Sequence, residues 1–177
     1  MSKLRLATVW LDGCSGCHMS FLDIDERLLA LAELVDLVYS PLVDHKEFPD
    51  QVDLTLVEGA VSTEGDLHKI KHIREHTRLL VSLGDCAVTG NVPSMRNAVG
   101  AQAVLKRGYL DGDVGAPRVP TLEIPALLPT VRPVHTVVPV DVYIPGCPPA
   151  ADVIFAVVSD LIAGKTPDVM ALTRFGK

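Results

Sequence analysis

Short apolar runs alternate with helical patterns along this chain, and this alternation limits its fold more than any other feature. The apolar runs end at Gly, Pro, Asp or Ser and occupy residues 4–11, 35–39, 52–57, 78–83 and 137–144. Between them, apolar spacing predicts helices that begin at Ser20, cover about 63–75 and 94–107, and follow Pro148-Pro149 as far as Ala163. Strands that alternate with helices form parallel βαβ units. The sequence therefore predicts a flavodoxin-like doubly wound sheet of order 2-1-3-4-5, with residues 1–177 as a single domain.

One segment before the last predicted strand departs from this alternation. Residues 111–139 lack clear periodicity, and nine of the 13 prolines fall between Pro117 and Pro149. An irregular connection of this length is uncommon inside a compact domain. It is either a surface excursion or an arm that lies against a partner, and the sequence leaves both interpretations open.

Composition and charge exclude some classes of partner. Hydrophobic residues make up 48% of the chain and the mean hydropathy is +0.30, but the apolar runs are too short to cross a bilayer. We therefore expect no membrane insertion, and we expect a partner subunit to cover the surplus apolar surface. The formal charge is -6, and Lys and Arg form no long cluster. Nucleic-acid binding is not expected.

The amino-terminal sequence "MSKLRLATVWL" resembles a strand more than a targeting segment. It has no apolar segment followed by a small-residue cleavage site, and no twin arginine. We therefore expect a cytoplasmic protein. Structural disulfides are rare in the cytosol, so the four cysteines suggest metal or thiol chemistry.

These cysteines follow the carboxyl ends of predicted strands. Cys14 and Cys17 follow the first strand, Cys86 the fourth and Cys147 the fifth. Parallel strands end at a common edge of the sheet, where ligands collect. We therefore expect the four thiols to gather around one point. Four thiolates suit either a zinc ion or an iron–sulfur cluster.

Cysteine spacing favours the cluster over a single zinc ion. Only Cys14 and Cys17 form a close pair, whereas Cys86 and Cys147 stand alone in "GDCAVTG" and "PGCPP", among small or rigid residues. Such loops suit a wide, preorganised cage. Structural zinc, a redox-active CxxC pair and four unrelated buried cysteines remain alternatives. The redox-pair interpretation leaves Cys86 and Cys147 unexplained.

Other polar residues are weaker candidates. His68, His72 and His76 recur every four residues, a spacing that can bind metal, but their charged neighbours favour a solvated helix face. His18 adjoins the cysteine pair and suits either a hydrogen bond to a cluster or a packing role. Glu58 ends the third strand in "LVEGAV" and suits a proton relay, a partner contact or simple turn chemistry. The chain contains no G-x-S-x-G, P-loop or G-x-G-x-x-G motif.

Four motifs resemble the small subunit of nickel–iron hydrogenases: "DGCSGCHMS", "VEGAV", "GDCAVTGNVPSMRN" and "VYIPGCPP". The resemblance covers the whole length. The related complex I cluster subunit shares the last motif, but it has adjacent cysteines at the first site and lacks the glutamate of "EGAV". Cys14-x-x-Cys17 and Glu58 therefore favour hydrogenase. Asp85 differs from the pattern of this family, because many relatives have Thr or Ser before the cysteine that corresponds to Cys86.

Within hydrogenases, exported enzymes have a twin-arginine leader and a longer small subunit with further cluster ligands. This chain is instead similar to the short small subunit of the soluble, bidirectional, NAD-reducing enzyme. The resemblance implies that Cys14, Cys17, Cys86 and Cys147 ligate one [4Fe-4S] cluster, proximal to a nickel–iron site on the large subunit. It also implies a hydrogen:NAD+ oxidoreductase whose diaphorase subunits carry flavin, further clusters and the NAD site.

The resemblance places no catalytic residue on this chain, apart from a candidate proton-relay or interface role for Glu58. Two other functions stay open. One is the cluster subunit of a complex I-type quinone oxidoreductase. The other is a zinc-stabilised assembly module without redox activity.

Overall fold

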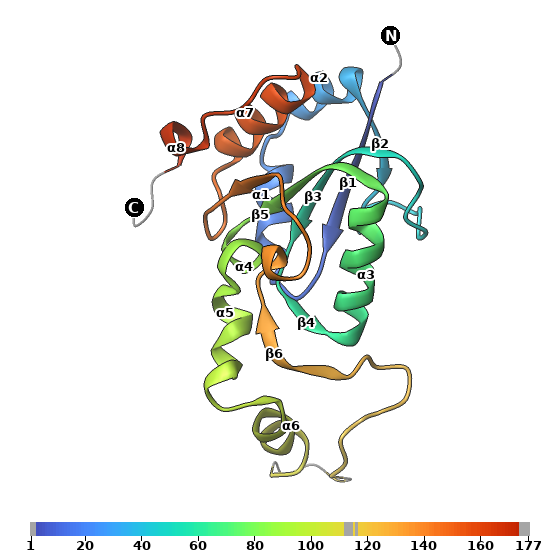
Figure 1. The fold of residues 1–177 in the computed structure, drawn as a ribbon, viewed down its shortest axis with the longest axis vertical. Coiled ribbons are helices and arrows are strands. Elements are labelled where there is room, and N and C mark those ends of the chain that lie inside the picture. Colours follow the sequence, from blue (N-terminus) through green and yellow to red (C-terminus); the bar gives the residue numbers. More distant parts are fainter. Residues whose placement is uncertain (1–2, 112–114, 116, 174–177) are drawn as a thin grey trace.

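The computed structural model describes residues 3–111, 115 and 117–173. At its centre lies a five-stranded sheet of order β2-β1-β3-β5-β7, in which all neighbouring strands are parallel (Figure 1). The strands are β1 (Leu4–Trp10), β2 (Val35–Tyr39), β3 (Val52–Glu58), β5 (Thr77–Leu83) and β7 (Val142–Ile144). The predicted doubly wound fold and its 2-1-3-4-5 order are confirmed, with β5 and β7 as the fourth and fifth predicted strands.

Helices cover both faces of this sheet (Figure 1). One face carries α1 (Gly16–Leu22), α2 (Arg27–Leu34) and α7 (Ala151–Ile162). The other carries α3 (Glu64–Glu75) and α4 (Asp85–Thr89). The sheet is therefore buried on both sides, which is why its strands read as nearly continuous apolar runs.

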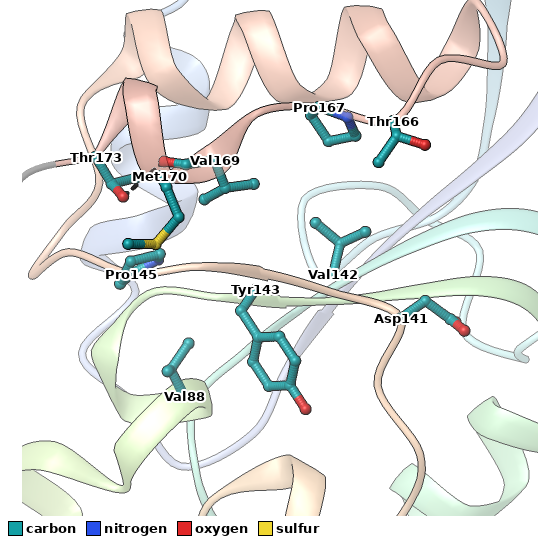
Figure 2. A pocket seen from close by; sticks show the side chains of 10 residues that line it. All are labelled: Val88, Asp141, Val142, Tyr143, Pro145, Thr166, Pro167, Val169, Met170 and Thr173. Carbon is teal, nitrogen blue, oxygen red and sulfur yellow. Dashed lines mark hydrogen bonds between the residues drawn. The ribbon is translucent and has the colours of Figure 1, made fainter.

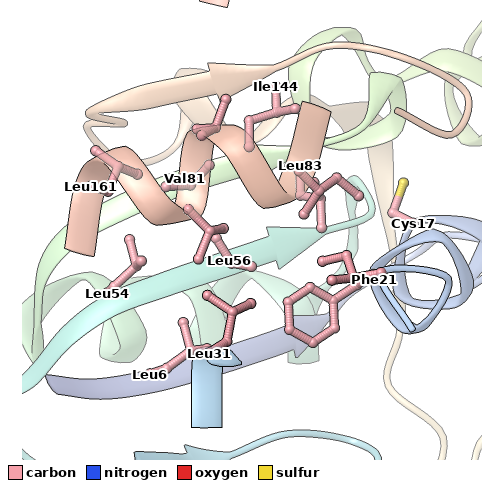
Figure 3. Packing of buried hydrophobic residues seen from close by; sticks show 14 of the residues in the cluster. Leu6, Cys17, Phe21, Leu31, Leu54, Leu56, Val81, Leu83, Ile144 and Leu161 are labelled. Atoms are coloured by element: carbon pink, nitrogen blue, oxygen red, sulfur yellow. The ribbon is translucent and has the colours of Figure 1, made fainter. Parts of the chain in front are cut away.

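Alternation along each strand builds two separate cores. In β5, Val81 and Leu83 belong to the cluster beneath α1, α2 and α7, whereas Leu80 belongs to the cluster beneath α3. Side chains of successive strand residues point to opposite faces, so one strand contributes to both. Figure 3 shows the first cluster, with Phe21 of α1 packed at its end and Cys17 beyond it. A substitution of Leu80 by alanine would cost about 2–5 kcal/mol of stability.

Local capping explains where α3 begins. Thr63 accepts a hydrogen bond from the Asp66 backbone N–H at 3.0 Å, and the Asp66 carboxylate accepts one from the Thr63 backbone N–H at 2.9 Å. This reciprocal pair satisfies two backbone donors at the start of the helix. The helix expected at about 63–75 therefore forms where its sequence indicates.

The prediction that the first helix begins at Ser20 is wrong. The helix α1 begins four residues earlier, at Gly16, after Ser15 in a left-handed conformation (φ 65°). The Ser20 hydroxyl lies inside the helix and donates a hydrogen bond to the Pro149 carbonyl. A tertiary contact to the last cysteine loop therefore uses the side chain that would otherwise cap a helix.

The helix predicted over 94–107 is divided into shorter elements. These are α5 (Asn91–Ser94), the 3-10 turn η1 (Met95–Ala98) and α6 (Ala101–Tyr109). Gly100 separates the last two with φ +84°, outside the helical region. The last predicted strand, 137–144, forms only over Val142–Ile144, and Pro139 within the predicted range lacks the backbone N–H that a ladder needs.

The proline-rich segment is more ordered than expected. It contains β6 (Leu127–Arg132), which pairs antiparallel with β4 (Val61–Thr63), followed by the 3-10 turn η2 (Val134–Thr136). Arg96 donates to the Leu128 carbonyl at 3.0 Å, and Asn97 exchanges two hydrogen bonds with Val131. Residues 117–126, directly before β6, run across the lower part of Figure 1. In this segment the Leu122 side chain is 86% exposed.

A short helix, α8 (Val169–Leu172), ends the described chain. Among the described helices, none combines the length and apolarity needed to cross a bilayer.

Candidate functional site

The four cysteines lie in three loops at the carboxyl edge of the sheet. Cys14 and Cys17 lie between β1 and the first turn of α1, Cys86 lies in α4 directly after β5, and Cys147 lies between β7 and α7. All four are free thiols. The charges of Cys14, Cys86 and Cys147 all act on Cys17, so the four sulfur atoms share one neighbourhood.

Burial and negative neighbours raise the pKa of two of these thiols, Cys17 and Cys86. Burial, followed by the Glu58 carboxylate, raises the pKa of the Cys17 thiol far above its ordinary value. Burial and the nearby Cys147 raise the pKa of Cys86, and a hydrogen bond from the Val92 backbone opposes this shift. The charged groups that shift these two pKa values are all negative. Four thiolates gathered here therefore need a cation, and a bound metal supplies that charge.

Glycines let the backbone approach the sulfur atoms closely. A Cβ atom added to Gly84 would lie 2.1 Å from Cys17 Sγ, and Gly84 has φ +81°. A Cβ atom added to Gly16 would lie 3.2 Å from Cys14 Sγ. Any larger residue at Gly84 would therefore displace the Cys17 side chain.

Hydrogen bonds join the second cysteine loop to the third. The Asp85 backbone N–H donates to the Gly146 carbonyl at 2.8 Å, and the Gly146 N–H donates to Asp85 Oδ1 at 2.7 Å. Asn91 Nδ2 donates to Cys147 Sγ at 3.3 Å. In the sequence, Asp85 was notable only because many relatives have Thr or Ser at its position. No sequence pattern indicated a role for Asn91. Asp85 holds the Cys86 and Cys147 loops together.

Glu58 and His18 form a buried pair beside Cys17. Their exposed fractions are 1% and 3%. Glu58 Oε2 accepts a hydrogen bond from the His18 backbone N–H at 3.0 Å and a second from His18 Nδ1. The pair fastens the first turn of α1 to the end of β3. Glu58 is thus a positioning residue for the cysteine pair, whereas a role as a proton relay stays a hypothesis.

We expect Glu58→Ala to destabilise the protein strongly. It leaves two buried His18 donors without their acceptor, and each unsatisfied buried donor costs about 1–3 kcal/mol. The thermal unfolding midpoint of the full chain should fall by roughly 10 °C. Glu33→Ala, at an exposed position of α2, is the control and should change the midpoint little. Equal shifts in the two variants would contradict this role.

The spacing of the sulfur atoms distinguishes between two kinds of metal centre. Among the described residues, no three cysteine sulfur atoms lie within 4.8 Å of one another. Ligand atoms of His72, Glu75 and His76, at another place in the fold, do lie that close together. Four sulfurs on one zinc ion would lie about 3.8 Å apart, since each Zn–S bond is about 2.3 Å. The cysteine sulfurs are therefore more widely spaced than the four sulfurs around a single zinc ion.

A separate apolar pocket of about 490 Å³ lies between β7 and α8 (Figure 2). Tyr143 of β7 and Pro145, directly after this strand, line it on one side, and Val169 and Met170 line it from the helix. None of the four cysteines is among its lining residues. The thiol site and this pocket are therefore distinct features.

Known proteins resemble this chain over most of its length. The sequence model of the NADH ubiquinone oxidoreductase, 20 kDa subunit, family matches residues 14–161. The delta subunit of the NAD-reducing hydrogenase HoxS of Cupriavidus necator is 42% identical, over 94% of this chain and 82% of that subunit. One subunit of the vhu F420-non-reducing hydrogenase of Methanocaldococcus jannaschii is 36% identical, over 93% of this chain and 58% of that protein.

Solved structures give the same result. The fold matches a chain of an NAD+-reducing [NiFe]-hydrogenase in its H2-reduced state with a TM-score of 0.93, at 42% identity, over 98% of this chain and 99% of that one. The [NiFeSe]-hydrogenase of Dm. baculatum matches with a TM-score of 0.59 at 19% identity, over 93% of this chain and 62% of that one. The second likeness concerns the fold alone. The resemblance to hydrogenase small subunits inferred from the motifs is confirmed.

Proposed function

This chain belongs to the NADH ubiquinone oxidoreductase, 20 kDa subunit, family, and we propose that it is the electron-transfer small subunit of an NAD-reducing nickel–iron hydrogenase. The single observation that carries the proposal is the gathering of four free thiols from three loops at one sheet edge. The 42% identity to a HoxS delta subunit supports it. In this role the chain transfers electrons between a nickel–iron site on the large subunit and diaphorase subunits that reduce NAD.

Cys14, Cys17, Cys86 and Cys147 would hold one [4Fe-4S] cluster, which accepts and releases one electron at a time when bound. The protein's part is to fix the four thiolates and, around Cys17, to exclude water. Buried Cys17 lies under the Gly84 backbone, and Asp85 joins the loops of Cys86 and Cys147. The negative charge of a carboxylate at Glu58 would disfavour an added electron and lower the potential.

Partner subunits would cover the exposed apolar side chains near the cysteine loops. Trp10 ends β1 and Met19 lies in α1, and both are exposed. Leu122 and Ile124, on the segment before β6, are exposed as well. Apolar side chains of this size favour a subunit contact over solvent. We assign the first pair to the contact with the large subunit, and the segment before β6 to an arm on a partner.

Purification of a tagged chain from anaerobic cells tests this function. We expect a brown complex that contains the large and diaphorase subunits, about four iron and four sulfide per chain bound by these cysteines, and hydrogen-dependent NAD+ reduction. A colourless chain with one zinc ion and no sulfide would instead support the assembly module.

A second candidate function follows from the name of the family itself, which describes a ubiquinone oxidoreductase subunit. In that role the same cluster would pass electrons to a quinone. Quinone reduction by the purified complex, without hydrogen uptake, would favour this alternative over the hydrogenase.

We expect Asn91→Asp to lower the midpoint potential of the cluster. The substitution removes the N–H donor to Cys147 Sγ and puts a negative oxygen in its place. Donors to a ligand sulfur favour the reduced state, and a hydrogen bond of about 1 kcal/mol corresponds to about 40 mV for one electron. Redox titration followed by EPR measures the shift.

The matched control for this shift is Asn97→Asp. Asn97 lies in η1 and bonds to Val131, so the same chemical change occurs there without contact to a cysteine sulfur. Its midpoint should stay at the wild-type value. Equal potentials in both variants would show that the Asn91 contact does not tune the cluster.

A further inference from the structure

We propose that His72, Glu75 and His76, together with Asp50, form a binding site for a divalent transition-metal ion, specifically Zn2+. Ligand atoms of the first three residues lie within 4.8 Å of one another. His72 and Glu75 belong to the last turn of α3, and His76 follows the helix directly before β5. This is the amino edge of the sheet, opposite the edge that carries the cysteines, so the site is separate from the electron-transfer centre.

The nitrogen of His76 that would bind the metal is Nε2, because Nδ1 is held by a backbone carbonyl. His76 Nδ1 lies 2.8 Å from the His72 carbonyl oxygen, which can only accept, so Nδ1 carries the hydrogen. His76 Nε2 lies 3.0 Å from Asp50 Oδ1. At this distance a proton on Nε2 joins the two atoms, and a bound metal ion would replace that proton. A histidine whose other nitrogen donates to a backbone carbonyl is the usual arrangement at zinc sites.

The surrounding structure holds the helix end and the Asp50 loop in register. The Val52 backbone N–H donates to the His76 carbonyl at 2.8 Å. The Phe48 ring packs edge-on against the His72 ring, with centroids 6.3 Å apart. Most of the scaffold is therefore fixed without a metal, and only the exposed ends of the side chains need to adjust.

The ligand chemistry favours zinc over calcium and magnesium. Two imidazoles and two carboxylates suit zinc at bond lengths of about 2.0–2.2 Å, whereas calcium and magnesium prefer oxygen ligands alone. The two carboxylates balance the charge of the ion. A cavity of about 550 Å³ that includes Asp50, Glu75 and His76 in its lining gives the ion access from solvent. A bound ion would tie α3 to the loop before β3.

The side chain of His68, one turn earlier on α3, provides a matched control. It belongs to the same row but lies outside the ligand group. We therefore compare wild type with His68→Ala, His72→Ala and His76→Ala, each as the full chain with its cluster intact. Zn2+ alone is titrated by calorimetry, and the thermal unfolding midpoint is measured with and without the ion. Iron and sulfide contents before and after the titration verify that zinc has not displaced the cluster.

We expect one Zn2+ per wild-type chain, equal affinity in His68→Ala, and affinity at least tenfold weaker in His72→Ala and His76→Ala. The unfolding midpoint should rise with Zn2+ only in wild type and His68→Ala. Asp50→Asn, whose side chain is 83% exposed, removes a ligand without risk to folding and should also weaken binding. Failure of wild type to bind, or equal affinity in all variants, would overturn the proposal and leave His76 and Asp50 as a simple ion pair.

Discussion

A Cys86→Ala variant is expected to lose hydrogen-dependent NAD+ reduction completely. Cys86 is the thiol that α4 contributes directly after β5, and the charges of Cys14 and Cys147 act on it. Without it, three thiolates remain, and a four-iron cluster loses one of its protein ligands. Because the proposed electron path has one cluster on this chain, no parallel route replaces it.

This prediction is tested on the purified complex by iron and sulfide analysis, EPR of the reduced protein and the hydrogen-dependent rate. Thr89→Ala is the matched control in the same helix. Its hydroxyl donates to the Asp85 carbonyl and is exposed, so its loss leaves all four thiols in place. We expect the control to keep its cluster and activity. Normal turnover of Cys86→Ala with the cluster missing would refute the electron-transfer role.

Gly84→Ala is the second substitution with a large expected effect. The added Cβ would lie 2.1 Å from Cys17 Sγ, so either the sulfur or the backbone has to move. The residue also has φ +81° and ψ 163°, a conformation almost restricted to glycine, which costs alanine about 1–3 kcal/mol. Overpacking adds about 1–3 kcal/mol. We expect a chain of lower stability that retains little iron.

Gly100→Ala separates the two causes. Gly100 has φ +84°, almost the same as Gly84, but a Cβ added there meets no atom within 4 Å. It should therefore show the conformational cost alone and keep a full complement of iron. Iron content and the thermal unfolding midpoint of both variants provide the comparison. If Gly84→Ala kept as much iron as Gly100→Ala, the close approach of the backbone to Cys17 would not matter for the site.

Several features of the molecule were predictable because they depend on local pattern and strand polarity. The alternation of apolar runs with helices predicted a parallel, doubly wound sheet. The flavodoxin-like strand order is one of the few arrangements that helical crossovers allow for it. The placement of Cys14, Cys17, Cys86 and Cys147 in loops at one edge follows from the same polarity. Their identity as cluster ligands stays a proposal that the geometry supports.

Local sequence patterns did not predict the structure correctly where segments distant in the chain come into contact. Ser20 has the residue type of a helix cap, yet its hydroxyl bonds to Pro149, more than a hundred residues away. The strand β6 lies inside an aperiodic, proline-rich stretch, and it forms because β4, Arg96 and Asn97 supply its partners. Periodicity cannot report a strand whose stability depends on such contacts.

The sequence by itself determined the five-stranded parallel sheet and the edge at which the thiols collect, because these depend on residue period and chain polarity. Only the tertiary structure decided which groups face one another. It paired Glu58 with His18, placed Asn91 on Cys147, and brought Asp50 to His76 rather than adding His68 to that group. Such contacts depend on ångström-scale distances between segments remote in the chain, and no local pattern of residues encodes those distances.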